Sequence, residues 1–123
     1  MTELVALLST GKGTWGHVSR LLDGMNGEKW ENVLLLTNEF GIKNFQPQEG
    51  VELVQLTKLR GSIKELSEEI QAKLKDKIKG MEIAVNFVSG DGKEHMALVA
   101  ALMRVGIGFR LVSLDTGGKA EEI

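Results

Sequence analysis

The fold of this chain is decided by one stretch, Ile83-Ala-Val-Asn-Phe-Val-Ser-Gly-Asp-Gly-Lys-Glu-His-Met96. The stretch opens with a short, mostly apolar run, which is typical of a strand buried on both faces of a sheet. A polar, glycine-rich turn follows, and a helical pattern begins at Asp91. A buried strand that passes through a tight turn into a helix is the building unit of an α/β sheet.

The same unit recurs on both sides of this stretch. Apolar runs predict strands at 4–8, 33–36, 51–56, 83–88 and 109–114. Helical periodicity predicts helices from Thr14 to about residue 24, over 62–79 and over 91–105. The segment 37–50 is long enough for a crossover between parallel strands, and its pattern allows either a short helix or an irregular loop.

Two of the predicted helices begin with capping-box spacing. Ser62 and Glu65 open the helix over 62–79, and Asp91 and Glu94 open the helix over 91–105. The inward stripe of the first of these helices is predicted to be Ile63, Leu66, Ile70, Leu74 and Ile78. The inward stripe of the second is predicted to be Met96, Val99, Ala100 and Met103, with Gly106 ending the helix.

Alternating strands and helices predict a single α/β domain over residues 1–123. Right-handed crossovers then favour a doubly wound, Rossmann-like parallel sheet of about five strands, in the order 3-2-1-4-5, with helices on both faces. The polar tail, 115–123, is expected to fray. In such a sheet ligands bind beyond the carboxyl ends of the strands where the strand order reverses, so the loops 9–17 and 89–95 are expected to meet at a ligand site.

Composition excludes several classes of protein. The chain has 17 Asp and Glu against 15 Lys and Arg, so no basic excess points to duplex nucleic acid as a partner. Cysteine is absent, which excludes disulfides, thiolate metal ligands and a cysteine nucleophile. The apolar run near the N-terminus is too short to span a membrane and has no basic lead, so we expect no membrane association, no signal peptide and a cytoplasmic protein.

The first loop has the composition of an anion-binding turn. Its predicted ligand-binding residues are Ser9, Thr10, Gly11, Lys12, Gly13, Thr14, Trp15 and His17. Glycines let the backbone approach a ligand, the helix start offers free N–H groups, Lys12 adds charge and Trp15 is suited to stacking on a base. The loop is not a Walker A motif, since Ala6 stands where that motif needs glycine. The alternative is an ordinary strand-to-helix turn with Thr14 as N-cap.

The second loop supplies a matching set of residues. Its predicted ligand-binding residues are Ser89, Gly90, Asp91, Gly92, Lys93 and His95. Lys93 lies in a first helical turn, where the helix dipole disfavours a cation, and this predicts an anionic ligand as its partner unless the side chain is simply solvated. The two histidines, His17 and His95, come without a recognisable third metal ligand, so we expect no metal site and no cofactor.

The run from Asn86 to Met96 resembles the fourth-strand motif of CARF domains, the CRISPR-associated Rossmann fold. The likeness rests on Ser89, Gly90, Gly92, Lys93 and Met96, followed by an alanine-rich helix. Asp91 departs from the motif, which has a small residue there, and Gly92 stands where threonine is common.

The resemblance implies a homodimer that binds cyclic oligoadenylate, a second messenger of type III CRISPR immunity, across its two-fold axis. A stand-alone CARF protein would act as a sensor, as a sink, or as a metal-independent ring nuclease in which a ribose 2′-OH attacks the neighbouring phosphate. In the ring nuclease, Lys93, Ser9 and Thr10 would be the catalytic residues, by positioning and charge stabilisation. The sequence leaves open whether the ligand is cleaved or only bound.

Two alternatives remain. The run Gly13-Thr-Trp-Gly-His17-Val is similar to the Gly-Thr-Gly-Gly-His-Val turn of some glycosyltransferases, with Trp15 in place of a glycine. That resemblance implies one Rossmann half of a two-subunit nucleotide-sugar glycosyltransferase. The other alternative is an interaction module without a ligand, for which Phe40, Ile42 and Phe45 would be the surface to test.

Overall fold

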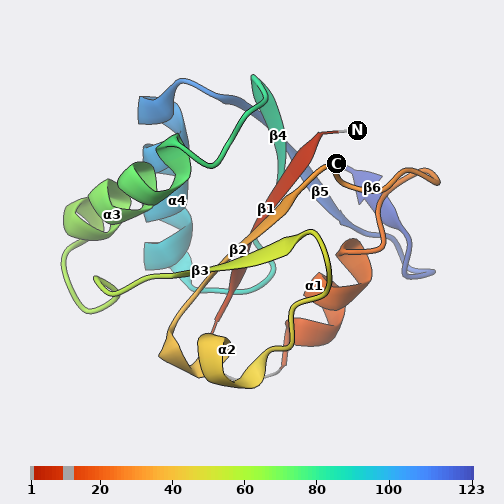
Figure 1. Cartoon of the computed structure of the whole chain (residues 1–123), viewed down its shortest axis with the longest axis horizontal. Coiled ribbons are helices and arrows are strands. Elements are labelled where there is room, and N and C mark those ends of the chain that lie inside the picture. The colour runs from red at the N-terminus through yellow and green to blue at the C-terminus, as the bar shows by residue number, and fades with distance from the viewer. Residues whose placement is uncertain (1, 10–12) are drawn as a thin grey trace.

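The structure is a computed structural model that describes residues 2–9 and 13–123. Strands and helices alternate along the chain and form one sheet with helices on both faces (Figure 1). The elements are β1 (Glu3–Leu8), α1 (Trp15–Leu21), β2 (Val33–Thr37), α2 (Glu39–Asn44), β3 (Val51–Gln55), α3 (Ile63–Lys75), β4 (Glu82–Asn86), α4 (Gly92–Val105), β5 (Gly108–Leu114) and β6 (Ala120–Glu122).

The sheet has the order β3-β2-β1-β4-β5-β6, and the pairs among the first five of these strands are parallel. The doubly wound α/β class and the predicted order 3-2-1-4-5 are therefore confirmed. The strand order reverses between β1 and β4, because the chain builds outward from β1 first on one side and then on the other.

The expectation of a frayed tail is wrong. Residues 120–122 form β6, which pairs antiparallel with β5 and makes the sheet mixed. The turn between the two strands is held by Asp115, whose Oδ1 accepts hydrogen bonds from the N–H groups of Gly117 (2.8 Å) and Lys119 (2.9 Å). On the outer surface the Arg110 guanidinium contacts the carboxylates of Glu82 and Glu122, which joins the last three strands of the sheet.

The core has two layers, one on each face of the sheet. β1 is buried along its whole length, and its side chains alternate between the layers. Val5 and Leu7 pack under α3 and α4, whereas Leu4, Ala6 and Leu8 pack under α1. A strand buried on both faces explains why residues 4–8 form an unbroken apolar run.

The predicted inward stripe of α4 is wrong. Met96 and Met103 are 61% and 71% exposed, and the buried residues are Ala97, Leu98, Ala101 and Leu102. Leu98 and Leu102 belong to the same core layer as Leu66 and Ile70 of α3. The two helices lie side by side on one face of the sheet (Figure 1), and small alanines at the contact allow α4 to approach closely. This packing sets the rotation of α4, and it leaves the two methionines outside.

The crossover 37–50 contains the short helix α2, one of its two predicted forms. Asn38 caps this helix by accepting a hydrogen bond from the Gly41 N–H at 2.9 Å. Gly41 packs directly against Thr37, since an added Cβ would lie 1.8 Å from the Thr37 Oγ1. Phe40 and Phe45 contact the ring of Trp15, with centroids 5.7 and 5.6 Å away. The segment therefore covers the α1 face of the core.

Both predicted capping boxes are present, at Ser62 with Glu65 and at Asp91 with Glu94. α3 ends at Lys75, four residues before its predicted end, and Gly106 closes α4 in the left-handed region at φ +81°.

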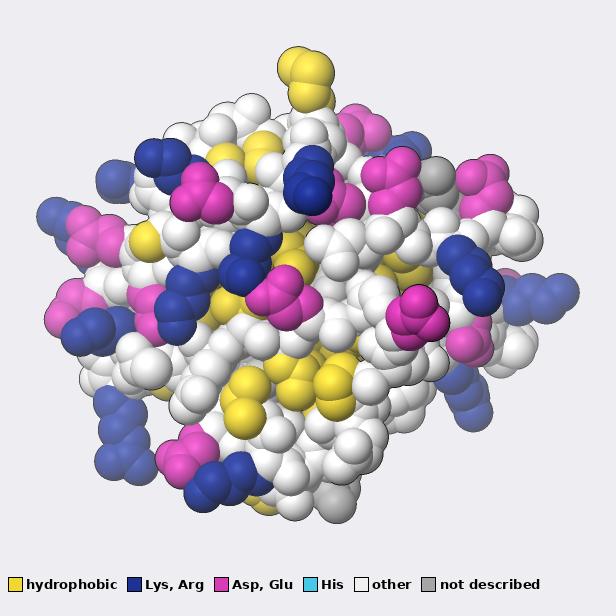
Figure 2. Space-filling model, viewed as in Figure 1, with side chains coloured by type: hydrophobic (Ala, Val, Ile, Leu, Met, Phe, Trp, Pro, Cys, Tyr) yellow, Lys and Arg dark blue, Asp and Glu magenta, His cyan; other side chains and the backbone are white. Residues whose placement is uncertain are grey.

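Within the described residues, none of the helices combines the length and apolarity needed to cross a membrane. Figure 2 shows acidic and basic side chains intermixed over one face of the molecule, without an extended basic patch on that face.

Candidate functional site

The loops that follow β1 and β4 meet, as the fold predicts. The backbone N–H of Ser9 donates to the hydroxyl of Ser89 at 2.7 Å, and the Ser89 hydroxyl donates to the Ser9 hydroxyl at 3.0 Å. The two serines are 80 positions apart in the sequence and lie at the carboxyl ends of neighbouring parallel strands. Their contact marks the point where the strand order reverses, which is where ligands bind in folds of this kind.

The first loop is described only in part. Thr10, Gly11 and Lys12, all three predicted to contact the ligand, lie outside the described residues. Thr14 occupies the N-cap position of α1, but its side chain makes no capping hydrogen bond. Among the described residues, no atom outside the local backbone lies within 4 Å of a Cβ added at Gly13 or Gly16.

Trp15 does not have the environment of a base-stacking platform. Its side chain is only 8% exposed, and its ring packs against Phe40 and Phe45. Its indole N–H donates to the carbonyl of Ser9 at 3.0 Å. Trp15 thus belongs to the core beneath α1, where it holds the end of β1, and the expectation that it stacks on a ligand is wrong.

His17 lies in the first turn of α1 beside the end of β4. Its Nε2 is 3.4 Å from the amide nitrogen of Asn86, a residue that is 2% exposed. Partial burial, assisted by the positive charge of Arg20, lowers the pKa of His17. The ring is therefore held in its neutral form more strongly than an exposed histidine would be.

His95 belongs to α4 and lies on the other face of the sheet from α1. Its Nε2 is 3.0 Å from the carbonyl of Ser89, and its ring contacts Phe87 edge-on. Among the residues that the structure describes, no group of three or more His, Cys, Asp or Glu side chains is placed to hold a metal ion. The two histidines contact different residues, Asn86 for His17 and Ser89 for His95.

Lys93 has a partner within the protein. Its ammonium group donates to the carbonyl of Leu59 at 2.9 Å and to the carbonyl of Gly61. These contacts tie the loop between β3 and α3 to the first turn of α4. Neither expected environment of Lys93, an anionic ligand or solvent alone, is needed to explain a lysine at this helix start, because two backbone carbonyls supply the negative dipoles.

The remaining residues of the second loop shape the start of α4. Asp91 is its N-cap and accepts a hydrogen bond from the Glu94 N–H at 2.8 Å. Gly92 faces open space. Gly90 has φ +98°, and a Cβ there would lie 2.9 Å from Glu94 Oε1 and 3.0 Å from Leu7 Cδ1. Glycine is required at position 90 both for its backbone conformation and for the close approach of Glu94.

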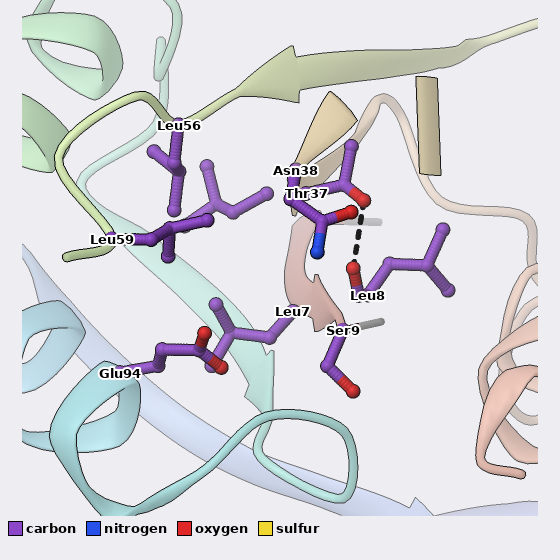
Figure 3. A pocket seen from close by; sticks show the side chains of 9 residues that line it. Leu7, Leu8, Ser9, Thr37, Asn38, Leu56, Leu59 and Glu94 are labelled. Carbon is purple, nitrogen blue, oxygen red and sulfur yellow. Dashed lines mark hydrogen bonds between the residues drawn. The ribbon is translucent and has the colours of Figure 1, made fainter. Parts of the chain in front are cut away.

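A small cleft lies beside the Ser9–Ser89 contact, and most of its residues were not singled out from the sequence (Figure 3). It is lined by Leu7, Leu8, Ser9, Leu36, Thr37, Asn38, Leu56, Leu59 and Glu94. An adjoining groove of about 610 Å³ shares Asn38, Leu56, Leu59 and Glu94 with the cleft, and adds Glu39, Phe40, Gln55, Thr57 and Arg60. The volume of the groove is in the range of small-molecule sites, roughly 300–1,000 Å³.

Glu94 is the charged group of the cleft. Burial raises the pKa of its carboxyl group, and the neighbouring Asp91 charge acts in the same direction, against the Asp91 N–H that favours the ionised form. One sequence signal points to the cleft: the polar residues Thr37 and Asn38 stand at the carboxyl end of the second strand. Ligands bind beyond the carboxyl ends of parallel strands, but the sequence analysis considers only the loops after the first and fourth strands. Glu94 escaped notice because its capping role already explained it.

The chain matches none of the protein-family models, and no curated protein is significantly similar to it in sequence. The fold and the cleft define the class of this protein: a Rossmann-like α/β domain with a ligand-sized groove at the carboxyl ends of its strands. Its function is therefore argued from the site itself.

Proposed function

We propose that the protein binds an adenine-containing anionic nucleotide at the carboxyl edge of its sheet, with cyclic oligoadenylate as the first ligand to test. The observation that carries the proposal is the direct contact between Ser9 and Ser89, which joins two glycine-rich helix starts beside a groove. Doubly wound sheets bind nucleotides at this position because helix N-termini and glycine-rich turns present backbone N–H groups to phosphate.

The open glycines support the phosphate part of this proposal. Gly13 precedes α1 and Gly92 begins α4, and within the described part of the chain a Cβ built at either glycine meets no other atom within 4 Å, which is compatible with a phosphate approaching there. The resemblance to CARF domains makes a cyclic oligoadenylate the specific candidate, and the role proposed with it is that of a sensor or a sink in type III CRISPR signalling. Lys12 remains the proposed cation of the first loop.

Binding is proposed ahead of cleavage. A metal-independent ring nuclease needs positive charge at the reacting phosphate, and the resemblance assigned that task to Lys93. The ammonium group of Lys93 is instead engaged by the carbonyls of Leu59 and Gly61. The hydroxyls of Ser9 and Ser89 hydrogen-bond to each other, so these two side chains hold the loops after β1 and β4 together.

Isothermal calorimetry with cyclic tetra-adenylate and cyclic hexa-adenylate tests the proposal. We expect one of the two to bind, and Ser89→Ala to weaken it severalfold, while Ser19→Ala on the exposed face of α1 leaves it unchanged. No heat with either ligand, from folded protein, would overturn the cyclic oligoadenylate proposal. Binding of a uridine diphosphate sugar instead would favour the glycosyltransferase alternative. Product analysis of the same mixtures shows whether the ring is opened.

The resemblance also implies a homodimer, which we propose with the outer face of α4 as the contact. Met96 and Met103 stand exposed on that face, about two helical turns apart, and offer apolar side chains to a second copy. The alternative surface was Phe40, Ile42 and Phe45, of which Phe40 and Ile42 are exposed, while the rings of Phe40 and Phe45 also pack on Trp15. Light scattering should show a dimer that Met103→Glu dissociates, and a monomer at high concentration, with and without ligand, would contradict the proposal.

A further inference from the structure

The loop that joins β3 to α3, residues 57–61, is held in place by two charged side chains. Glu69 of α3 accepts hydrogen bonds from the first two N–H groups of the loop, each at 2.8 Å. Lys93 of α4 donates to the carbonyl groups on both sides of Arg60. The backbone that carries Arg60 is therefore fixed from two helices, so a ligand that binds there would have little of the loop to order.

The guanidinium of Arg60 has no counter-ion of its own. Among the residues that the structure describes, it takes part in no ion pair and no hydrogen bond, although the chain has more acidic than basic side chains. Arg60 lines the groove of about 610 Å³ at the carboxyl ends of β2 and β3. A guanidinium suits a phosphate group, which it contacts through two parallel hydrogen bonds.

Two carboxylates also line the groove, and neither of them pairs with Arg60. Glu39 is paired with Lys43 at 2.8 Å, and Glu94 accepts the Asp91 N–H at 3.1 Å. Glu94 also lines the narrow cleft beside the groove, whereas Arg60 does not, so the two charges mark different parts of the groove. An anionic group that enters at Arg60 therefore meets an unpaired cation.

We infer that this groove binds one adenosine 5′-phosphate unit, with its phosphate on Arg60 and its adenine against Phe40 and Gln55. The inference rests on the proposed function for the class of ligand. It adds a subsite at the ends of β2 and β3, beyond the loops that follow β1 and β4. The groove, unlike the narrow cleft beside it, has the volume of a small-molecule site.

The groove also offers the contacts that a base needs. Phe40 of α2 is 36% exposed and contributes an aromatic ring. Leu56 and Leu59 lie across from the start of α2 (Figure 3) and supply aliphatic surface. Gln55 ends β3, and its side-chain amide has no hydrogen-bond partner among the described residues. A glutamine amide pairs with adenine at two points, because it accepts from the N6 amine and donates to N7.

Titration of isotope-labelled protein with AMP, adenosine and IMP, followed by amide NMR, tests the inference. AMP should shift the amide signals of Phe40, Gln55 and Arg60. Adenosine lacks the phosphate and should bind about tenfold more weakly or worse, since a charge-assisted contact is lost. IMP has a carbonyl oxygen in place of the amine and should bind severalfold more weakly. Absence of AMP binding, shifts confined to other regions, or equal affinity for AMP and either other compound would overturn the inference.

Two variants separate the phosphate contact from the base contact. Arg60→Met keeps the aliphatic stem without the charge, so AMP should bind about tenfold more weakly while adenosine binding is unchanged. Gln55→Met should abolish the preference for AMP over IMP. Both residues are exposed, so the variants should fold. Arg104→Met is the matched control, because Arg104 is exposed on α4 and does not line the groove. Full affinity of Arg60→Met for AMP would overturn the inference.

The outcome is separable from that of the proposed function. If cyclic tetra-adenylate binds without shifting the signals of the groove, and Arg60→Met leaves its affinity unchanged, the groove subsite is wrong and the proposed function stands. If AMP binds in the groove while neither cyclic oligoadenylate binds, the second-messenger proposal is wrong and the groove subsite stands.

Discussion

The amide nitrogen of Asn86 faces Nε2 of His17. The Asn86 Oδ1 accepts the Val88 N–H at 3.1 Å and its Nδ2 donates to the Val112 carbonyl at 2.9 Å, so two backbone partners set the orientation of the amide. The second hydrogen of Nδ2 then faces His17 Nε2 at 3.4 Å. A donor facing Nε2 favours the tautomer in which this nitrogen accepts and the ring proton lies on Nδ1.

This arrangement predicts an unusual histidine. Protonation at Nε2 would set two donors against each other, and burial also disfavours the charge, so His17 should titrate below its usual range. Ring ¹⁵N chemical shifts over a pH series should show the Nδ1–H tautomer at neutral pH. Asn86→Asp should raise the pKa of His17 by replacing the donor with a carboxylate. An Nε2–H tautomer in the unmodified protein would contradict the assignment.

Glu69 should make the protein sensitive to acid. Burial raises the pKa of its carboxyl group, but hydrogen bonds from the N–H groups of Thr57 and Lys58 and from the Thr57 hydroxyl outweigh burial and leave the pKa lowered. A depressed carboxyl pKa contributes stability that is present above the unfolded value, about 4.3, and is lost as the pH falls through the folded value.

The test of this prediction is urea unfolding between pH 7 and pH 3. Glu69→Gln should lower stability at pH 7 and flatten the loss of stability on the acid side. Glu68→Gln is the control, since Glu68 is an exposed neighbour on the same helix. An equal acid dependence in the two variants would show that Glu69 is not the group responsible.

Lys93 should behave as a structural residue. Lys93→Met keeps the aliphatic stem but removes the hydrogen bonds to the carbonyls of Leu59 and Gly61. We expect a loss of about 1.5–3 kcal/mol in the free energy of unfolding, as for hydrogen bonds made by a charged group. Denaturant titration measures it, with the exposed Lys64→Met as control. If Lys93→Met is as stable as Lys64→Met, the structural role of Lys93 is contradicted and Lys93 is again a candidate ligand-binding residue.

Gly90 and Gly92 should respond differently to alanine. Gly90→Ala introduces a left-handed backbone strain at φ +98° and contacts with Glu94 and Leu7, so we expect a loss of more than about 1 kcal/mol. Gly92→Ala adds a methyl group in open space at the first residue of α4, and its stability should be unchanged or slightly higher. Thermal unfolding of the two variants compares them directly, and equal melting temperatures would refute the steric argument.

The candidate site was predictable only in its backbone. The glycine-rich turns after β1 and β4 can be recognised in the sequence, and the contact of Ser9 with Ser89 follows from the order of the parallel strands. The roles of Lys93 and Trp15 could not be predicted from the sequence, because each depends on a partner distant in sequence. That partner is the loop after β3 for Lys93 and α2 for Trp15. A polar or aromatic residue at a loop has the same local pattern whether it faces a ligand or another part of the chain.

The sequence by itself determined the first five strands, the helices α1, α3 and α4, and the order in which those strands pair. Continuous apolar runs, capping boxes and right-handed crossovers are local or nearly local, and they leave one topology for the first five strands. Only the tertiary structure decided the rotation of α4, the pairing of β6 and the cleft around Glu94. Those features depend on how side chains from distant segments fill the space between helix and sheet, and a periodic pattern does not contain that information.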